Sequence, residues 1–234
     1  MKNKFNNTLS IIISIAFIIT AFFGSIHYFC FNERFYEKEH SKIMLYGKHI
    51  NEHIGISDED LKQITSFTLD YLNDPDASLD IQMNVKGKVR EIYTDDEKLH
   101  MEDVRSLNLA ANYILIFSSI VLVISSLLFI LKKGDIKLLF IKYKKIISIF
   151  MIFFAFLGLW IFIDFDSFWT FFHHIFFAGN DLWLLDLRKD ILIMIVPPEF
   201  FNDLVIRIVI TFVLLICLGY IVLYLLKRKK NIND

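Results

Sequence analysis

Two groups of polar residues stand inside or beside apolar stretches of this 234-residue sequence. The first is His100 with Asp103 in "LHMEDV" (99–104), and the second is the pair His173 and His174 in "FWTFFHHIFF" (168–177). Residues three apart share one face of a helix, so Asp103 can orient the His100 ring and hold one tautomer. Histidine is the most frequent general acid or base in enzymes. The pattern therefore favours proton-transfer chemistry on these histidines.

Other catalytic motifs are absent from the sequence. There is no G-x-S-x-G nucleophile motif, no H-E-x-x-H, no C-x-x-C and no glycine loop that would cradle phosphate. A zinc site built from His100, Asp103, His173 and His174 is conceivable, but nothing in the spacing favours it. A structural alternative also stands for His173 and His174: an interfacial helix whose histidines turn toward water. Adjacent helix residues point about 100° apart, however, so one ring can face water while the other faces the protein interior and serves in catalysis.

The composition indicates which elements must position these residues. The chain is 55% hydrophobic with 25 phenylalanines, yet 22% of its residues are charged, which is typical of membrane helices joined to a water-facing region. Four apolar runs are long enough to span about 30 Å of hydrocarbon. They are residues 9–29, 109–131, 146–163 and 204–226. We therefore predict an integral membrane protein, mainly α, with four transmembrane helices, the first an uncleaved anchor.

Lysine and arginine predict the orientation of these spans. The ends 1–8 and 227–234 and the loop 132–145 together hold twelve basic residues and two acidic ones, whereas the connections 30–108 and 164–203 hold twelve and 24. By the positive-inside rule both termini are cytoplasmic and both long connections are extracytoplasmic. The net charge of −1, without a basic stripe, argues against a nucleic-acid partner.

The connection 30–108 is expected to form a small extracytoplasmic α(+β) domain. Residues 57–73 predict an amphipathic helix with a Ser57–Asp60 capping box. Its expected apolar face is Leu61, Ile64, Phe67, Tyr71 and Leu72. Residues 79–89 alternate in polarity and turn near Lys86-Gly87, which predicts a strand or hairpin. A further helix should begin at Asp95 or Asp96 and run into the second span, carrying His100 just above the bilayer.

The connection 164–203 is rich in aromatic residues. Asp164, Asp166 or Ser167 can cap a new helix, and Gly179-Asn180 can end it. Because aromatic side chains favour the membrane interface, we predict an aromatic interfacial or re-entrant helix here. Residues 181–201 are expected to continue along the interface, and Pro197-Pro198 should stop any helix before the last span.

The motifs "LHMEDV" (99–104) before a span and "FHHIFFAGNDLWLLD" (172–186) after the next outward crossing resemble those of the lipoprotein intramolecular transacylases, four-span membrane proteins of Gram-positive bacteria. The resemblance covers nearly the whole chain. It implies an acyltransferase that moves the sn-2 acyl chain of a lipoprotein's S-diacylglyceryl group onto the α-amine of its N-terminal cysteine, which forms a lyso-form lipoprotein. Leu187 stands where a proline would be expected after the aspartate of "LLD".

The resemblance also implies roles for individual residues. His100 and His173 are the expected catalytic pair, supported by Asp103 and His174. The α-amine has a pKa near 8 and needs a general base, which one histidine can supply, while the other stabilises the oxyanion. The sequence does not say which histidine plays which part. Residues expected to contact substrate are Phe172, Phe176, Phe177, Asn180, Trp183 and Arg188.

No ATP or cofactor is required, because conversion of an ester to an amide is downhill, and no metal is expected. The expected partners are a diacylated lipoprotein and membrane lipid, with the oligomeric state left open. The expected location is the bacterial cytoplasmic membrane, with the active site on the extracytoplasmic side. Two alternatives remain at this point: a non-catalytic membrane sensor or assembly partner with an extracytoplasmic binding domain, and a membrane hydrolase using metal-bound water. Alanine at either histidine would leave the sensor active, and a chelator would inactivate the hydrolase.

Overall fold

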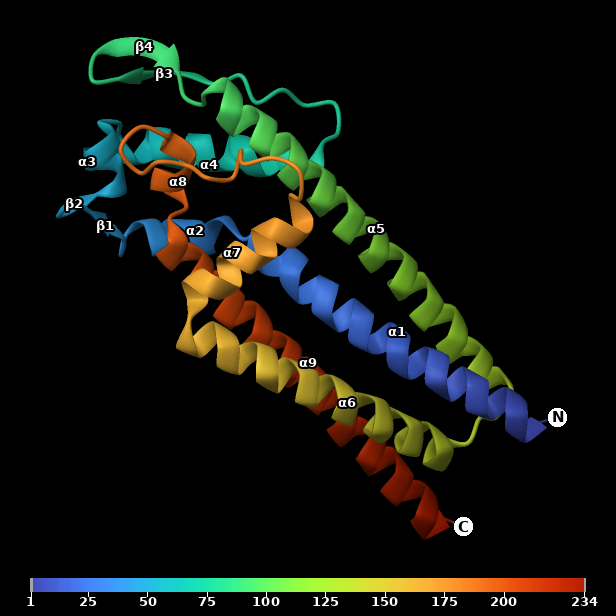
Figure 1. Ribbon diagram of the computed structural model, residues 1–234. Helices are drawn as coiled ribbons and strands as arrows, with labels where there is room; N and C mark the ends of the chain where they lie inside the picture. The colour runs from blue at the N-terminus through green and yellow to red at the C-terminus, as the bar shows by residue number, and fades with distance from the viewer. Residues whose placement is uncertain (1, 234) are drawn as a thin grey trace. The chain divides into compact units, whose positions relative to one another are not determined.

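The computed structural model describes residues 2–233, so residues 1 and 234 of the predicted cytoplasmic ends lie outside it. The chain forms two compact units. The helical unit comprises Met1–His27, Ala111–Ile163 and Arg207–Asp234, and the αβ unit comprises Tyr28–Ala110 and Asp164–Ile206. Figure 1 shows the helices and strands that make up these units.

Four long helices are apolar enough to cross a membrane. They are α1 (Lys2–Cys30), α5 (Asp95–Leu131), α6 (Ile136–Ile163) and α9 (Pro198–Asn233). Each predicted span lies inside one of them. The segment 132–145, expected as a loop, is helical from Ile136 onward. Lysine is a good helix former, so its clustering there does not interrupt α6.

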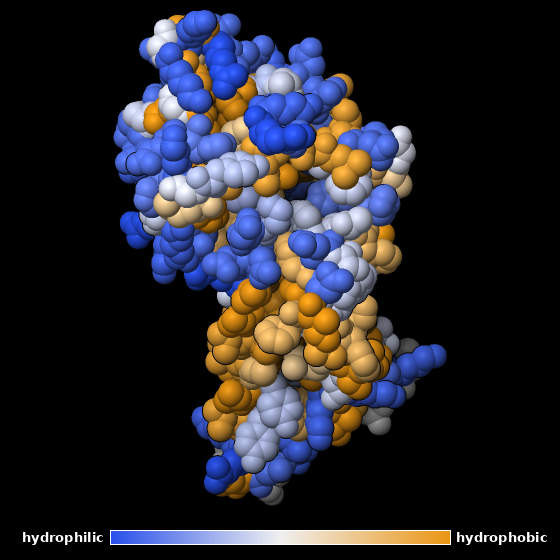
Figure 2. Space-filling model, turned by 60° about the vertical axis from the view of Figure 1, so that its left-hand side comes forward, coloured by the Kyte–Doolittle hydropathy of each residue, from blue (hydrophilic) through white to orange (hydrophobic). Residues whose placement is uncertain are grey.

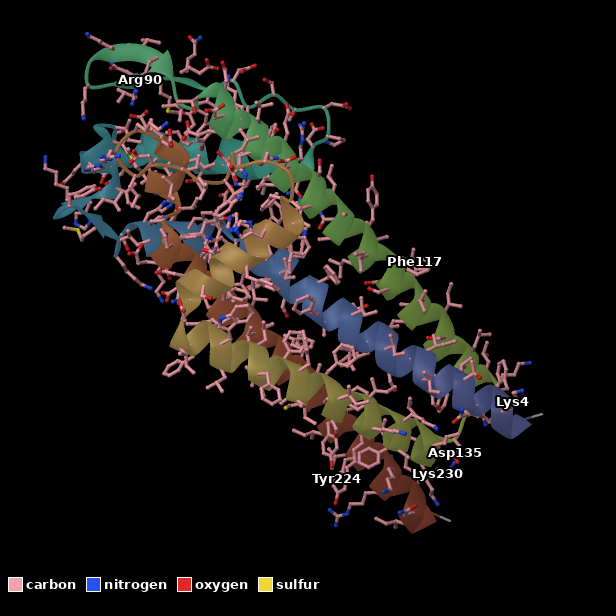
Figure 3. The ribbon with its side chains drawn as sticks, in the orientation of Figure 1. Lys4, Arg90, Phe117, Asp135, Tyr224 and Lys230 are labelled. Carbon is pink, nitrogen blue, oxygen red and sulfur yellow. The ribbon has the colours of Figure 1, made fainter. Side chains whose placement is uncertain are left out.

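The helical unit is held by apolar packing. Its main cluster of buried residues is Ile18, Ala21, Tyr143, Ile147, Phe212 and Ile216. On the face drawn in Figure 2, hydrophobic side chains gather over the long helices. Figure 3 shows that Lys4, Asp135 and Lys230 lie at the same end of this unit. Lys4 near one chain end, Lys230 near the other and the α5–α6 connection therefore share one end of the helical unit.

The αβ unit combines short helices with two hairpins. Besides the first turns of α5 and α9, its elements are α2 (Glu33–His40), β1 (Met44–Leu45), β2 (Lys48–His49), α3 (Ile50–Ile54), α4 (Asp58–Asn73), β3 (Gln82–Val85), β4 (Lys88–Glu91), α7 (Phe165–Phe176) and α8 (Ile191–Ile195). Strand β1 pairs antiparallel with β2, and β3 pairs antiparallel with β4. Lys86 and Gly87 connect β3 to β4 with φ of 53° and 82°, a backbone that suits the glycine.

Helix α4 confirms the predicted capping box, since Ser57 and Asp60 each bond the other's backbone N–H. The predicted apolar face was wrong at Phe67, whose side chain is 50% exposed, whereas Leu69 is buried. At about 100° per residue, Phe67 lies some 120° around the helix from Leu61 and so leaves the buried face.

The segment 181–195 corrects a second expectation. Its apolar residues Ile191, Leu192, Met194 and Ile195 are buried in the main core of the αβ unit, with Ile50, Ile64, Met83, Ile92 and Met101 among their neighbours in the same cluster. Only the short helix α8 is regular in this segment. A run of apolar residues can pack into a protein core or lie in a membrane interface. The composition of the segment alone therefore did not distinguish the two locations. Proline does separate α8 from α9, as predicted.

Candidate active site

His100 lies in the second turn of α5. The helix begins at Asp95, and Thr94 and Glu97 form reciprocal bonds at its start: Thr94 N donates to Glu97 Oε2 at 2.6 Å, and Glu97 N donates to Thr94 Oγ1 at 3.3 Å. Such reciprocal bonds satisfy backbone donors that a helix start leaves unpaired. The helix is thereby fixed one turn before His100, whose side chain is buried.

His173 lies in the last turn of α7. Asp164 caps the helix by accepting from Ser167 N at 3.0 Å. The helix ends at Phe176, where Phe177 N donates to the His173 carbonyl at 2.8 Å. Gly179 follows with φ of 116°, a conformation that favours glycine. Of the three caps that the sequence offered, Asp164 is the one observed, and the helix ends three residues before Gly179.

The two histidines come together within the αβ unit. Their ring centroids are 6.3 Å apart, with an interplanar angle of 28°. The ring of Phe177 lies against both, 5.1 Å from His100 and 5.4 Å from His173. His100, His173 and Phe177 are all buried. Two imidazoles 73 positions apart in the sequence thus share one aromatic enclosure.

A backbone hydrogen bond fixes the tautomer of His173. Its Nδ1 lies 2.7 Å from the carbonyl oxygen of Trp169. A carbonyl only accepts, so Nδ1 must carry the proton, and in the neutral ring Nε2 then has a free lone pair. The indole of Trp183 stacks on the same ring at 4.8 Å and 30°. In its neutral form the His173 ring therefore carries its free lone pair on Nε2.

Burial keeps both rings neutral. It lowers the pKa of His100 to about 4, with a smaller lowering from His173 and an opposing effect of Asp103. Burial likewise lowers the pKa of His173, while the Trp169 carbonyl acts in the opposite direction. The cause is the cost of desolvating an imidazolium. His100 Nδ1 is buried without a hydrogen-bond partner in the structure. This nitrogen can therefore still form a hydrogen bond with a bound group.

Asp103 differs from its predicted role of orienting His100. Its Oδ2 accepts from Asn180 Nδ2 at 3.0 Å. Among the contacts of the described residues, no hydrogen bond joins it to the His100 ring. Asp103 influences His100 through charge and ties α5 to the segment that follows α7.

Some of the remaining predicted site residues lie near His173, and others lie on the surface. His174 is exposed and touches Trp183 edge-on at 5.2 Å. Phe172 stacks on Trp169 at 5.2 Å and contacts Phe176 at 4.7 Å. Arg188 is an exposed residue paired with Asp186, and no contact with the histidines is seen for it in the described chain. The conceivable zinc set is not assembled either, because no three described His, Cys, Asp or Glu residues converge as metal ligands.

Comparison with known proteins places the chain in a family. The family model described as lipoprotein intramolecular transacylase Lit matches residues 11–201. The chain belongs to this family. It is accordingly a membrane-integral acyltransferase, and the resemblance read from the two histidine motifs is confirmed. A search of curated proteins finds no match.

Solved structures show the same fold. The structure of the membrane-integral lipoprotein intramolecular transacylase Lit from Bacillus cereus superimposes with a TM-score of 0.80 at 19% identity, covering 98% of this chain and 99% of that one. Two variants of that protein, with a histidine replaced by arginine or alanine, give TM-scores of 0.73 and 0.69 at 19% and 20% identity, with coverage of 99% of this chain and 96% and 97% of theirs. The transacylase fold thus extends over nearly the whole chain.

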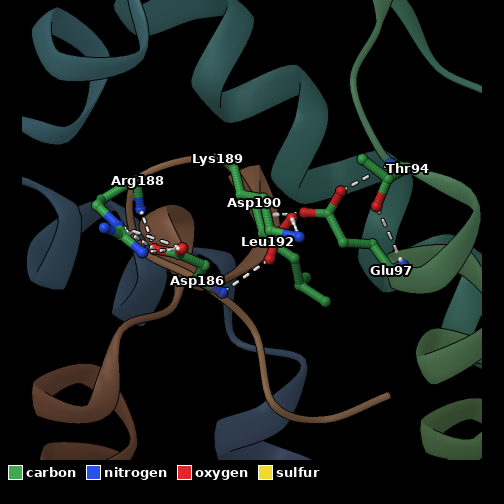
Figure 4. A network of polar contacts seen from close by, with 7 residues as sticks. All are labelled: Thr94, Glu97, Asp186, Arg188, Lys189, Asp190 and Leu192. Atoms are coloured by element: carbon green, nitrogen blue, oxygen red, sulfur yellow. Dashed lines mark hydrogen bonds and ion pairs between the residues drawn. The ribbon is translucent and has the colours of Figure 1, made fainter. Parts of the chain in front are cut away.

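Sequence reasoning missed two contributors to the site. The Trp169 carbonyl fixes His173, and a four-residue spacing within a predicted helix could have suggested it. Glu97 bonds the backbone of Leu192 as well as that of Thr94 (Figure 4). The T-x-x-E pattern at 94–97 marks a capping box, but nothing local points to residue 192.

Proposed function

We propose that this transacylase moves the sn-2 acyl chain of an S-diacylglyceryl lipoprotein onto the α-amine of the N-terminal cysteine. The observation that carries the proposal is the hydrogen bond from His173 Nδ1–H to the Trp169 carbonyl, beside His100. It leaves Nε2 of a neutral imidazole free to accept a proton. The substrate brings both its nucleophile and its ester, so the protein needs a base and an oxyanion stabiliser rather than a nucleophile of its own.

The histidines take different parts in the proposed reaction. His173 Nε2 removes a proton from the amine as its nitrogen attacks the ester carbonyl, forming a C–N bond. The N–H of neutral His100 donates to the developing oxyanion, an effect worth roughly 3 kcal/mol for one donor. The C–O bond to glycerol then breaks, and His173 returns the proton to the departing oxygen. Holding amine and ester in one lipid supplies proximity, which contributes up to about 7–11 kcal/mol.

Burial suits this division of work. A base that must be unprotonated at neutral pH gains from the same desolvation that lowers its pKa. Phe177 and Trp183 exclude water around His173, which strengthens hydrogen bonds to the transition state. The exposed side chains of Phe171, Ile175 and Phe176 on α7 offer an apolar surface for lipid. By charge we assign the termini to the cytoplasm and this site to the extracytoplasmic side.

A synthetic diacylated lipopeptide tests the proposal directly. It would carry different acyl chains at sn-1 and sn-2 and be incubated with purified protein in lipid vesicles. Fragmentation mass spectrometry should find the sn-2 chain, and not the sn-1 chain, on the α-nitrogen. A lipopeptide with an acetylated amine is the control and should not react. Transfer of the sn-1 chain, or release of free fatty acid without N-acylation, would refute the proposal.

A further inference from the structure

We infer that Glu97 is a positioning residue of this enzyme: it clamps the segment 177–192 onto α5 and so sets the spacing of the two imidazoles. The inference rests on the proposed function and adds to it a residue that touches neither imidazole. Phe177 and Trp183 belong to the clamped segment, and both contact the ring of His173.

Glu97 forms hydrogen bonds both at the start of α5 and in α8. Its side chain is fully buried. Oε2 accepts from Thr94 N at 2.6 Å, at the start of α5, and Oε1 accepts from Leu192 N at 2.7 Å, in the first turn of α8 (Figure 4). One carboxylate therefore satisfies two backbone donors, one at the start of its own helix and one at Leu192, 95 positions after Glu97. A buried carboxylate with both oxygens bonded to N–H groups holds the two segments firmly together, because breaking either bond would leave a buried N–H donor without a partner.

Glu97 is the first of three residues on one face of α5 that contact the same segment. Glu97, His100 and Asp103 follow at intervals of three and so lie along one side of the helix. Glu97 bonds Leu192, the His100 ring contacts Phe177, and Asp103 bonds Asn180. Of the two polar contacts, only that of Glu97 is fully buried. It is thus the contact best shielded from exchange with water.

The turn that leads into α8 is also held by hydrogen bonds to the backbone. Asp190, which is buried, accepts from Asp186 N at 2.7 Å and closes the turn that precedes α8. Burial raises the pKa of Glu97, and the nearby Asp190 adds to the rise, while the N–H groups of Thr94 and Leu192 oppose it. These two donors are what makes a carboxylate tolerable there. An amide at position 97 would turn an N–H₂ group toward one of the two backbone donors and lose that bond.

A matched control exists in the same unit. Asp60 forms the same kind of capping box with Ser57 at the start of α4, but its carboxylate is only partly buried and bonds the backbone and hydroxyl of Ser57, not a distant segment. Asp60→Asn therefore changes a helix cap by the same chemistry without touching the segment 177–192. A difference between the two variants isolates the clamp from the general cost of losing a cap.

The experiment compares Glu97→Gln with Asp60→Asn in steady-state transfer on a diacylated lipopeptide and in hydrogen exchange. Glu97→Gln should lower kcat about tenfold to hundredfold, as small misplacements of catalytic groups do, with KM changed by less than about threefold. Amides of 186–196 should exchange faster in this variant only. Asp60→Asn should keep kcat and KM within about twofold of wild type.

The outcomes separate the clamp from the proposed function. Wild-type kcat in folded Glu97→Gln would overturn the inference, as would a loss in KM alone. If Glu97→Gln does not fold, Glu97→Asp serves instead, because its shorter carboxylate cannot reach both donors; wild-type kcat there would also overturn the inference. If wild-type protein fails to transfer acyl chains, the proposed function falls, and unchanged exchange at 186–196 in Glu97→Gln would overturn the clamp separately.

Discussion

At the scale of single residues, the proposed site depends on two imidazoles whose neutral form is favoured by burial. His173 Nδ1–H donates a hydrogen bond to the Trp169 carbonyl, which leaves the lone pair of the neutral ring on Nε2. Burial lowers the pKa of both His173 and His100. Charging the imidazole would cost free energy in this aromatic surrounding, because the rings of Phe177 and Trp183 do not replace the hydrogen bonds that water gives an imidazolium. The same burial that costs stability in acid thus keeps a base available at neutral pH.

The pH dependence of the transfer rate follows from these shifts. As pH falls below about 8, the substrate amine becomes protonated and the rate should drop about tenfold per pH unit. The pKa of His173 lies below its ordinary value of 6.5, so its protonation adds a second factor only below pH 6.5. A plot of log kcat/KM against pH should therefore have a slope of 1 between about pH 6.5 and 8 and steepen toward 2 below that range. A slope of 2 already at pH 7 would contradict a depressed His173 pKa.

The local sequence suggested the two histidines as candidates but did not predict the partners that the structure gives them. The motif pairing of His100 with Asp103 suggested a hydrogen bond within one helix turn, yet Asp103 bonds Asn180, 77 positions away. Whether a side chain bonds a local or a distant partner depends on the tertiary structure. The spacing of residues along one helix carries no information about that. The Trp169 carbonyl, four residues before His173, is the part of the site that helix periodicity alone could have supplied.

At the scale of elements, helix ends decide where the histidines lie. Helix α7 begins at Phe165 because Asp164 breaks the apolar run of α6 and accepts from Ser167 N. His173 is nine residues after this cap. Helix α5 begins at Asp95, after Thr94, and His100 follows in its second turn.

Removing the α7 cap should weaken the site. Asp164→Ala is expected to destabilise the protein by about 1 kcal/mol and to lower the transfer rate, whereas Asp164→Asn, which keeps a good capping group, should stay near wild type. Asp166→Ala is the control, because Asp166 is an exposed acidic residue in the same turn that is not the cap. Thermal unfolding in detergent, together with the lipopeptide assay, measures both effects. Equal losses in Asp164→Ala and Asp166→Ala would show that the cap itself is unimportant.

Elements with local signals were predictable from the sequence. The capping box at Ser57, the turn at Lys86-Gly87 and the cap at Asp164 each fix an element by the residues inside it. The segment 181–195 was not predictable in this way. Its apolar residues pack into the core of the αβ unit, and only contacts with distant residues such as Glu97 determine its path.

At the scale of the whole molecule, the apolar runs and the basic residues determine the class of protein. Four helices are long and apolar enough to cross a membrane. The basic residues gather at both chain ends and between α5 and the middle of α6, and Lys4, Asp135 and Lys230 lie at one end of the helical unit (Figure 3). This distribution predicts that both termini are cytoplasmic and the segments 30–108 and 164–203 extracytoplasmic.

Cysteine labelling in intact cells tests that orientation. With Cys30 replaced by serine and Cys217 by alanine, single cysteines would be placed at Asn84, in β3, and at Asn231, near the C-terminal end of α9. A membrane-impermeant maleimide should label Asn84→Cys in intact cells and Asn231→Cys only after lysis. The opposite pattern would invert the topology and move the proposed site to the cytoplasmic side.

The most direct test of the central claim is mass spectrometry of the N-terminal peptide of a reporter lipoprotein. The reporter would be expressed in a strain lacking other N-acylating enzymes, together with wild-type protein, His100→Ala or His173→Ala. We predict conversion from the diacylglyceryl form with a free amine to the N-acyl lyso form with wild type, and loss of conversion in both variants at unchanged protein levels. Conversion by either histidine variant at the wild-type rate would contradict the assignment of the two imidazoles as the catalytic pair.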